Sequence, residues 1–262
     1  MADVTANGVR LHVQRLGAGA AAARTVVFVH GLVMDNLSSF YFTLANPVAA
    51  AGADVVLYDL RGHGLSGRPA AGYAVPDLVA DLAALLDALD VARPVHLVGN
   101  SVGGTIVLAF AAAHPERVAS LALIDAHDGA EGWAAQMTAT LALRGDARDA
   151  KIAETFAAWL GRHSERKRSR LATAAQALVE GTSLVADLAA SPPLDAAALA
   201  RIRCPVLAIY GERSDVRDRG EALAAALPAC TLRLLPGCTH SVLWEATAEV
   251  RAALLAWLEE AA

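Results

Sequence analysis

Hydrophobic positions along the chain fall into short continuous runs, separated by longer stretches in which apolar residues recur at spacings of three and four. The short runs are rich in Val, Leu and Ile, as expected of strands buried on both faces of a parallel sheet. We expect strands at Val9–Arg15, Thr25–Val29, Asp54–Tyr58, Pro94–Val98, Ser120–Ile124, Val206–Tyr210 and Thr231–Leu235.

Helical spacing fills most of the intervals between these runs. It predicts helices at Pro76–Leu89, Val102–Ala113, Gly220–Leu227 and Thr247–Glu260. Regular alternation of strand and helix is typical of βαβ units, which build a parallel sheet with helices on both faces. The fold class is therefore α/β.

The alternation stops between Ile124 and Val206, where only helical patterning occurs, most clearly at Lys151–Leu160 and Arg170–Leu188. A crossover between parallel strands needs about a dozen residues, so this longer stretch is an insertion. We predict an α/β core of residues 1–125 and 203–262. A helical cap, 126–202, is inserted after the sixth strand, where open α/β sheets bind ligands. A helical decoration away from the site is the alternative.

Composition narrows the class of protein. The chain has 262 residues and a formal net charge of −5, which suits one folded domain with an inserted segment and argues against a nucleic-acid partner.

Residues 94–113 carry no charge, but their centre is rich in glycine and polar side chains, so we predict no membrane span. The start of the chain lacks the basic and apolar pattern of a secretory signal, and we expect a cytoplasmic protein.

The three cysteines, Cys204, Cys230 and Cys238, are too few for a disulfide framework. None is spaced with histidine as a zinc site requires. We expect no metal and no organic cofactor.

The strongest chemical signal is Gly99-Asn100-Ser101-Val102-Gly103, a G-x-S-x-G pattern between a predicted strand and a predicted helix. Such a turn exposes the serine hydroxyl at the helix N-terminus, where backbone N–H groups favour an oxyanion. We therefore predict that Ser101 is a nucleophile.

A serine nucleophile needs a base, and the base needs a carboxylate that orients it. His240 lies between the last strand and the last helix, so it can reach the sheet edge that carries Ser101. Asp215, just past the preceding strand, is the favoured acid. Asp125, which ends an earlier strand, and Glu212 remain alternatives.

The oxyanion of acyl transfer needs two backbone donors. The loop His30-Gly31-Leu32 follows an early strand, and we expect the N–H groups of Leu32 and Val102 to converge on the substrate oxygen. His30 itself is expected to be buried beneath this loop.

These residues resemble the α/β-hydrolase family from Val9 to the last helix. The matching features are His30-Gly31, the segment Asp59–Ser66, the turn at Ser101, and the order Ser, Asp, His. The resemblance implies about eight strands, a triad of Ser101, His240 and Asp215, and an oxyanion hole of Leu32 and Val102. Small capped esterases, lactonases and perhydrolases are the most similar subgroup. Asn100 recurs in the carbon–carbon bond hydrolases of the family.

A second glycine pattern, Gly62–Gly67, fits G-x-G-x-x-G but is followed by Arg68-Pro69. A dinucleotide site requires a helix directly after it, so we interpret this segment as a packed turn in which Asp59 and Arg61 pair with each other.

The cap holds two further candidate features. Arg162–Arg170 is basic; a solvated helix face explains it, and docking of an acidic carrier or CoA is the sharper hypothesis. Residues expected around the substrate are His30, Gly31, Met34, Trp133, Met137 and Trp159.

Together these features predict a serine hydrolase that cleaves an ester, lactone or thioester of a small hydrophobic substrate. Carbon–carbon bond hydrolysis, a lyase or cyclase step, cofactor-free oxidation, or a binding module on the same scaffold are the alternatives. The sequence leaves oligomeric state open.

Overall fold

The computed structural model describes residues 2–17, 19, 22–147, 150, 151, 161 and 164–260. An eight-stranded sheet runs through its centre in the order β1-β2-β4-β3-β5-β6-β7-β8. The strands are β1 (Ala2–Ala6), β2 (Val9–Leu16), β3 (Thr25–Val29), β4 (Asp54–Tyr58), β5 (Val95–Asn100), β6 (Val118–Ile124), β7 (Val206–Gly211) and β8 (Cys230–Leu235). Strands β3 to β8 are mutually parallel, and β1 and β2 add an antiparallel edge.

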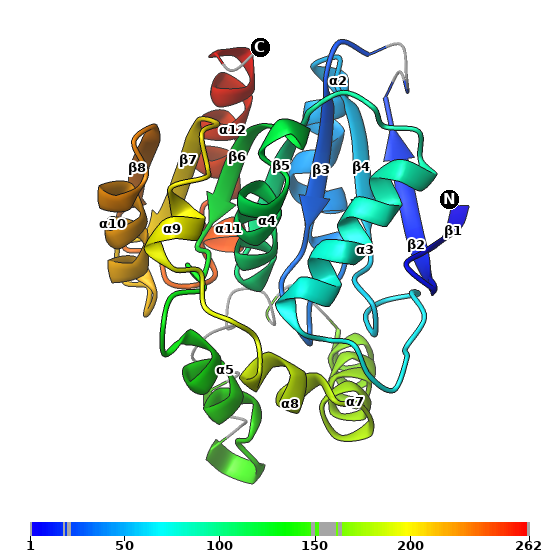
Figure 1. Ribbon diagram of the computed structural model, residues 1–262. Helices are drawn as coiled ribbons and strands as arrows, with labels where there is room; N and C mark the ends of the chain where they lie inside the picture. The colour runs from blue at the N-terminus through cyan, green and yellow to red at the C-terminus, as the bar shows by residue number, and fades with distance from the viewer. Residues whose placement is uncertain are drawn as a thin grey trace.

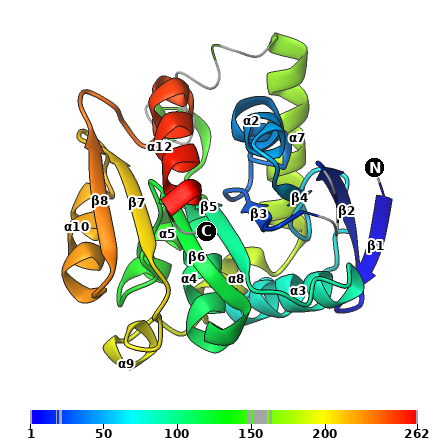
Figure 2. The same ribbon diagram turned by 90° about the horizontal axis from the view of Figure 1, so that it is seen from above.

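Helices cover both faces of the sheet (Figures 1 and 2). One face carries α3 (Val75–Ala88), α4 (Val102–Ala113) and α10 (Arg217–Ala226), and the short turn η3 (Pro115–Arg117) connects α4 to β6. The other carries α1 (Ser38–Phe40), η2 (Tyr41–Ala45), α2 (Asn46–Ala50), α11 (Val242–Glu245) and α12 (Thr247–Glu260). Two apolar cores, one on each face, fix these layers, which confirms the predicted α/β class.

The segment between β6 and β7 contributes α5 (Trp133–Leu141), α7 (Glu165–Gly181), α8 (Leu184–Ala189) and α9 (Ala196–Leu199). The first three lie beyond the carboxyl ends of the strands (Figure 1), and we refer to α5, α7 and α8 as the cap helices. In contrast, α9 packs on α4, and Ala198 belongs to the core on that face. The division at 126–202 stays a prediction.

The cap was expected to contain one helix over Arg170–Leu188, but the structure has two. Helix α7 ends before Thr182, whose extended backbone lets α8 start in a new direction. The predicted helix at Lys151–Leu160 lies, beyond Lys151, outside the described residues.

Strand register decides which residues meet at the carboxyl edge. Asn100, the last residue of β5, is paired with Ile124, the last residue of β6, and Ile124 is paired with Ile209 of β7. Ser101 and Asp125 therefore leave neighbouring strands at the same level, on the side where the cap helices lie.

The glycine pattern after β4 forms a packed turn. The Asp59 carboxylate accepts the backbone N–H groups of Leu37 at 2.9 Å and Leu65 at 2.8 Å. A side chain at Gly64 would collide with that carboxylate. Arg61 does not pair with Asp59 but donates to the buried Asp81 of α3, with Nε 2.6 Å from the carboxylate, so the turn is fixed to the helix.

Candidate active site

Ser101 occupies a sharp turn between β5 and α4. Its φ of 54° and ψ of −122° lie outside the regions that non-glycine residues favour. The turn is held by a hydrogen bond from the Ser101 N–H to the Ile124 carbonyl, 3.0 Å long. The strain keeps the hydroxyl raised above the end of the sheet, as the G-x-S-x-G pattern predicts.

Close backbone packing around this turn explains the flanking glycines. A Cβ at Gly103 would stand 2.1 Å from the Val29 carbonyl oxygen, and one at Gly99 would stand 2.5 Å from the Gly103 carbonyl oxygen. These gaps are too small for any side chain, so β3, β5 and α4 can meet here only with glycine at both positions.

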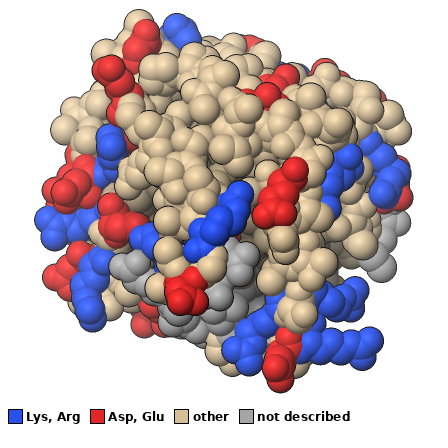
Figure 3. Space-filling model, turned by 90° about the horizontal axis from the view of Figure 1, so that it is seen from below, with Lys and Arg blue, Asp and Glu red and all other residues tan. Residues whose placement is uncertain are grey.

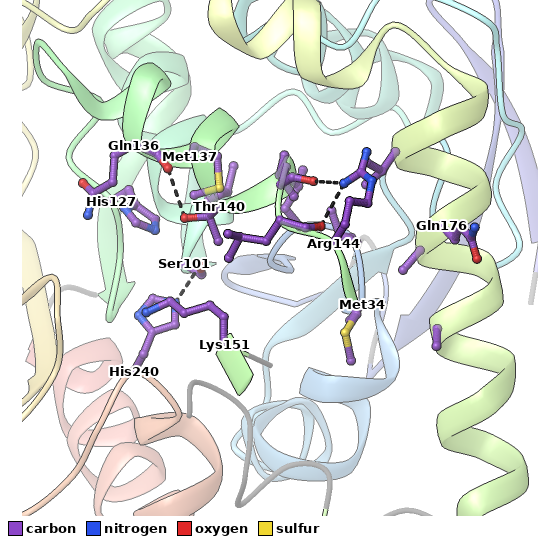
Figure 4. A pocket seen from close by; sticks show the side chains of 18 of the residues that line it. Met34, Ser101, His127, Gln136, Met137, Thr140, Arg144, Lys151, Gln176 and His240 are labelled. Atoms are coloured by element: carbon purple, nitrogen blue, oxygen red, sulfur yellow. Dashed lines mark hydrogen bonds between the residues drawn. The ribbon is translucent and has the colours of Figure 1, made fainter. Parts of the chain in front are cut away.

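His240 links the serine, to which Figure 4 shows its hydrogen bond, to a carboxylate. Its Nε2 is 3.0 Å from Ser101 Oγ, and its Nδ1 is 2.6 Å from Oδ2 of Asp125. The loop that follows β8 carries His240 to this edge, just before α11. The three side chains form one continuous hydrogen-bonded chain.

The carboxylate that bonds His240 is therefore Asp125, whereas the sequence favoured Asp215. Asp215 Oδ1 is 3.8 Å from the same Nδ1, which is ion-pair rather than hydrogen-bond distance, and its side chain is 49% exposed. Glu212, the other alternative, faces away and accepts the N–H of Gly237. The catalytic role of each acid stays a prediction, but the geometry favours Asp125.

Asp125 is fully buried and held from three sides. Oδ1 accepts the Gly211 N–H at 2.7 Å, and Oδ2 accepts the hydroxyl of Ser214 as well as the His240 ring. The Asp125 N–H donates to Ile209. The turn after β7 thus fixes the carboxylate through Ser214, and Asp215, one residue further on, is left at the rim.

Charges at the site favour a basic imidazole. Burial disfavours the charged ring of His240, but the Asp125 hydrogen bond and the charges of Asp125 and Asp215 outweigh it, so the pKa of His240 is raised above its ordinary value. For Asp215, burial acts against ionisation, yet the His240 charge and Lys151, whose Nζ is 3.3 Å away, lower its pKa. Both carboxylates therefore stabilise an imidazolium.

Two backbone donors flank the serine. Among the described residues, neither the Leu32 N–H nor the Val102 N–H has a hydrogen-bond acceptor, and both residues line the cavity that contains Ser101. Val102 begins α4, so the helix dipole adds to its donor strength. Two free amides at this position can hold a developing oxyanion.

The loop that carries Leu32 is fixed by a buried histidine. Val33 has a φ of 65°, and its N–H donates to Nε2 of His63 at 2.8 Å. Burial, and then the neighbouring His30, lower the pKa of His63 to about 3, so its ring is neutral and can accept this bond. His63 therefore holds the strained Val33 backbone that orients the Leu32 amide.

A cavity of about 240 Å³ extends from Ser101 to the cap helices (Figure 4). Its wall is mainly apolar, with Leu32 and Val102 from the core and Met137, Ala175 and Val179 from the cap helices. A second cavity of about 40 Å³ meets the first at four shared residues and continues toward Trp244. The shared residues are Leu32, Met34, Ser101 and His240.

The predicted lining residues have different positions. Met34 and Met137 line the large cavity, and Gly31 lines the small one. His30 is fully buried and accepts the Leu60 N–H on Nε2, so it supports the loop from below. Trp133 is buried and lines neither cavity. Trp159 lies outside the described residues.

Some cavity residues were not singled out from the sequence. They are His127, Gln136, Thr140, Arg144, Lys151, Gln176 and Glu180. For His127, the sequence does offer a signal of a place in the cavity, because the residue lies two positions past Asp125, at the end of a strand. The others lie in the cap, where helical spacing alone does not reveal which face meets the core.

The basic segment of the cap belongs to the first turns of α7. Arg166, Arg168 and Arg170 are exposed, and Arg162 lies outside the described residues. In Figure 3, Lys and Arg side chains gather where α7 lies, with an acidic side chain among them. Docking of an acidic carrier or CoA stays a prediction.

A family model of the alpha/beta hydrolase fold matches residues 24–247, so the chain belongs to the α/β-hydrolase fold family. The chain is 32% identical over 253 residues to 2-hydroxy-6-oxononadienedioate/2-hydroxy-6-oxononatrienedioate hydrolase 2 of Pseudomonas putida. This match covers 90% of this chain and 87% of that protein. Matches to two other curated relatives span 44% and 28% of the lengths of those proteins.

Solved structures agree in fold. A meta-cleavage product hydrolase from Pseudomonas fluorescens IP01 has a TM-score of 0.82 at 20% identity, with 100% of this chain and 98% of that chain covered. A thermophilic esterase from Thermogutta terrifontis has a TM-score of 0.80 at 21% identity, with 99% and 98% covered. The family model and the Pseudomonas putida relative support a hydrolase and leave the bond it cleaves open.

The described part of the chain contains neither a helix suited to a membrane nor a cluster of metal ligands. None of the helices in that part of the chain is long and apolar enough to cross a membrane. No group of three or more His, Cys, Asp or Glu side chains there could hold a metal ion.

Proposed function

We propose that this protein is a serine hydrolase that cleaves an ester, lactone or thioester through an acyl-enzyme on Ser101. The observation that carries the proposal is the continuous hydrogen-bonded chain from Asp125 through His240 to Ser101. The free amides of Leu32 and Val102 beside it supply the matching oxyanion donors. Binding alone needs neither a strained serine nor a paired imidazole.

In the proposed reaction, Ser101 Oγ attacks the substrate carbonyl and its proton passes to Nε2 of His240. The carbonyl oxygen becomes negative and accepts the two amide hydrogens of Leu32 and Val102. The intermediate collapses when Nε2–H protonates the departing oxygen or sulfur. A water molecule, deprotonated by His240, then attacks the acyl-enzyme and releases the acid.

Asp125 has the orienting role in this proposal. Its carboxylate accepts the Nδ1–H of His240, which keeps Nε2 free to take the serine proton, and it stabilises the imidazolium that forms. The mainly apolar wall of the 240 Å³ cavity suits a small hydrophobic acyl group.

Initial rates on p-nitrophenyl esters of increasing acyl length test the proposal, with wild type beside Ser101→Ala. We expect saturable turnover in wild type and a loss of at least about 10³-fold in the variant, since triad serines contribute that much or more. Equal rates in the two proteins would show that the serine is not the nucleophile. The chain-length optimum reports the size of the acyl site.

Carbon–carbon bond hydrolysis is the second candidate. It is favoured by the match to the dienedioate hydrolase of Pseudomonas putida over 90% of this chain. The test is disappearance of a 2-hydroxy-6-oxo-dienoate, followed by its visible absorbance, in the same two proteins. Turnover of the dienoate at least about tenfold faster than of any ester, lost in Ser101→Ala, would select this reaction.

A further inference from the structure

One buried polar side chain in the cavity wall has no partner. His127 is only 9% exposed, and neither ring nitrogen has a hydrogen-bond partner in the described part of the chain. The ring nitrogens are not among the fully enclosed polar atoms that lack a partner, so they are accessible to a molecule in the cavity. His127 lines the cavity that contains Ser101.

The ring stands beside the reacting atoms. Its centroid is 5.7 Å from that of His240, and His240 in turn contacts Ser101. Figure 4 shows the His127 ring on the α5 side of this pair. A substrate atom that bonds His127 therefore belongs to the part of the substrate next to the scissile bond.

The backbone of His127 is anchored to the nucleophile turn. Its N–H donates to the Ser101 carbonyl at 3.3 Å, and its own carbonyl accepts the hydroxyl of Thr105 of α4 at 2.8 Å. On its other side the ring is 6.4 Å from that of Trp133. The imidazole is thus placed before a substrate arrives, which reduces the ordering cost of binding.

The chemistry of this imidazole restricts what it can bind. Burial, followed by the charge of His240, lowers the pKa of His127 to about 3, so the ring is neutral wherever His240 can act as a base. A neutral imidazole offers one donor and one acceptor. It suits a hydroxyl or a carbonyl, and it has no charge with which to attract a carboxylate.

We propose that His127 forms a polar subsite that binds an uncharged oxygen of the substrate, carried close to the scissile carbonyl. The preferred substrates are then hydroxyacyl or oxoacyl esters, or lactones with such a group, rather than plain alkyl esters. This inference rests on the proposed acyl transfer at Ser101 and specifies its substrate class.

The test compares p-nitrophenyl butanoate with its 2-hydroxy, 3-hydroxy and 3-oxo derivatives in wild type and in His127→Phe, which keeps an aromatic ring without nitrogens. We expect wild type to prefer at least one oxygenated ester by about tenfold in kcat/KM, as one buried hydrogen bond allows. The preference should fall to about one in His127→Phe and recover partly in His127→Asn.

Thr140→Val is the matched control. Thr140 lines the same cavity, but its hydroxyl already donates to the Gln136 carbonyl, so the substrate preference should remain. Wild type without any preference, or a preference unchanged in His127→Phe, would overturn the proposal.

Calorimetry separates this inference from the proposed function. In a Ser101→Ala background, nonhydrolysable amides of butanoate and of its oxygenated derivatives are titrated with and without His127→Phe. Tighter binding of an oxygenated amide that disappears in His127→Phe supports the subsite even if no ester is cleaved. If His127→Phe leaves the affinity for every oxygenated amide unchanged, the subsite is refuted even if Ser101 acts on esters.

Discussion

Replacing Asp125 by Asn removes the carboxylate that receives the Nδ1–H of His240, whereas replacing Asp215 by Asn leaves that hydrogen bond intact. In Asp125→Asn the new amide can donate to Nδ1, which moves the ring proton to Nε2, where it faces Ser101. A histidine in this tautomer cannot take the serine proton. A loss of kcat of about 10⁴-fold follows from the same change in other triads.

The effect of Asp215→Asn should be far smaller. At 3.8 Å, a charge pair screened by water is worth about 1 kcal/mol, the upper end for exposed pairs. A change of that size alters a rate about fivefold. The two variants are therefore predicted to differ by roughly three orders of magnitude, although both remove one carboxylate near the same ring.

The assay is kcat on the best p-nitrophenyl ester, with thermal unfolding of each variant as the control. Asp125 accepts bonds from Gly211, Ser214 and His240, and Asn retains one oxygen for them, so the variant should remain folded. If Asp215→Asn lost more than about a hundredfold in kcat while Asp125→Asn lost less than tenfold, the assignment of the orienting acid would be refuted.

Three further predictions concern packing and pH. Gly103→Ala places a Cβ 2.1 Å from the Val29 carbonyl oxygen and should lower the free energy of unfolding by about 3 kcal/mol, measured in urea; an unchanged midpoint would contradict the geometry of the turn. The rate kcat/KM should fall as His240 becomes protonated, and because its pKa is raised, the acidic limb of the pH profile should lie above about 6.5; a limb below that value would contradict the expected shift. Arg61→Met leaves the buried Asp81 carboxylate without its ion pair and should cost about 3–5 kcal/mol, while Arg61→Met with Asp81→Leu should recover most of it; equal losses in both variants would mean that the pair is not responsible.

The sequence predicted the elements nearest the site well. Helices α4 and α12 have the expected bounds, Val102–Ala113 and Thr247–Glu260, because strong apolar spacing and tertiary packing agree there. The edge strand β1 and the short helices from Ser38 to Ala50 were not assigned individually. Their apolar residues follow no regular period, and contacts with the sheet determine their structure.

The choice between the two acids could not be made from the sequence. Asp125 and Asp215 each follow a strand of the same parallel sheet, so both were expected at the same edge. The difference lies in register, which pairs Ile124 with the last residue of β5, and in the turn after β7, which brings Ser214 to Asp125. Both are tertiary features. Likewise, no local pattern tells which cap side chains line the cavity.

The long connection from β6 to β7 also has a consequence for how this fold can be assembled and altered. Parallel pairing of Ile124 with Ile209 closes a loop of roughly 80 residues, where about a dozen would suffice. Chain-closure entropy grows only logarithmically, so the additional length disfavours the closed sheet by about 2 kcal/mol. Because Asp125 is held by β7, exchange of the cap for another insert should have a modest thermodynamic cost and leave Asp125 in place. The same scaffold can thereby acquire new substrates through this one segment.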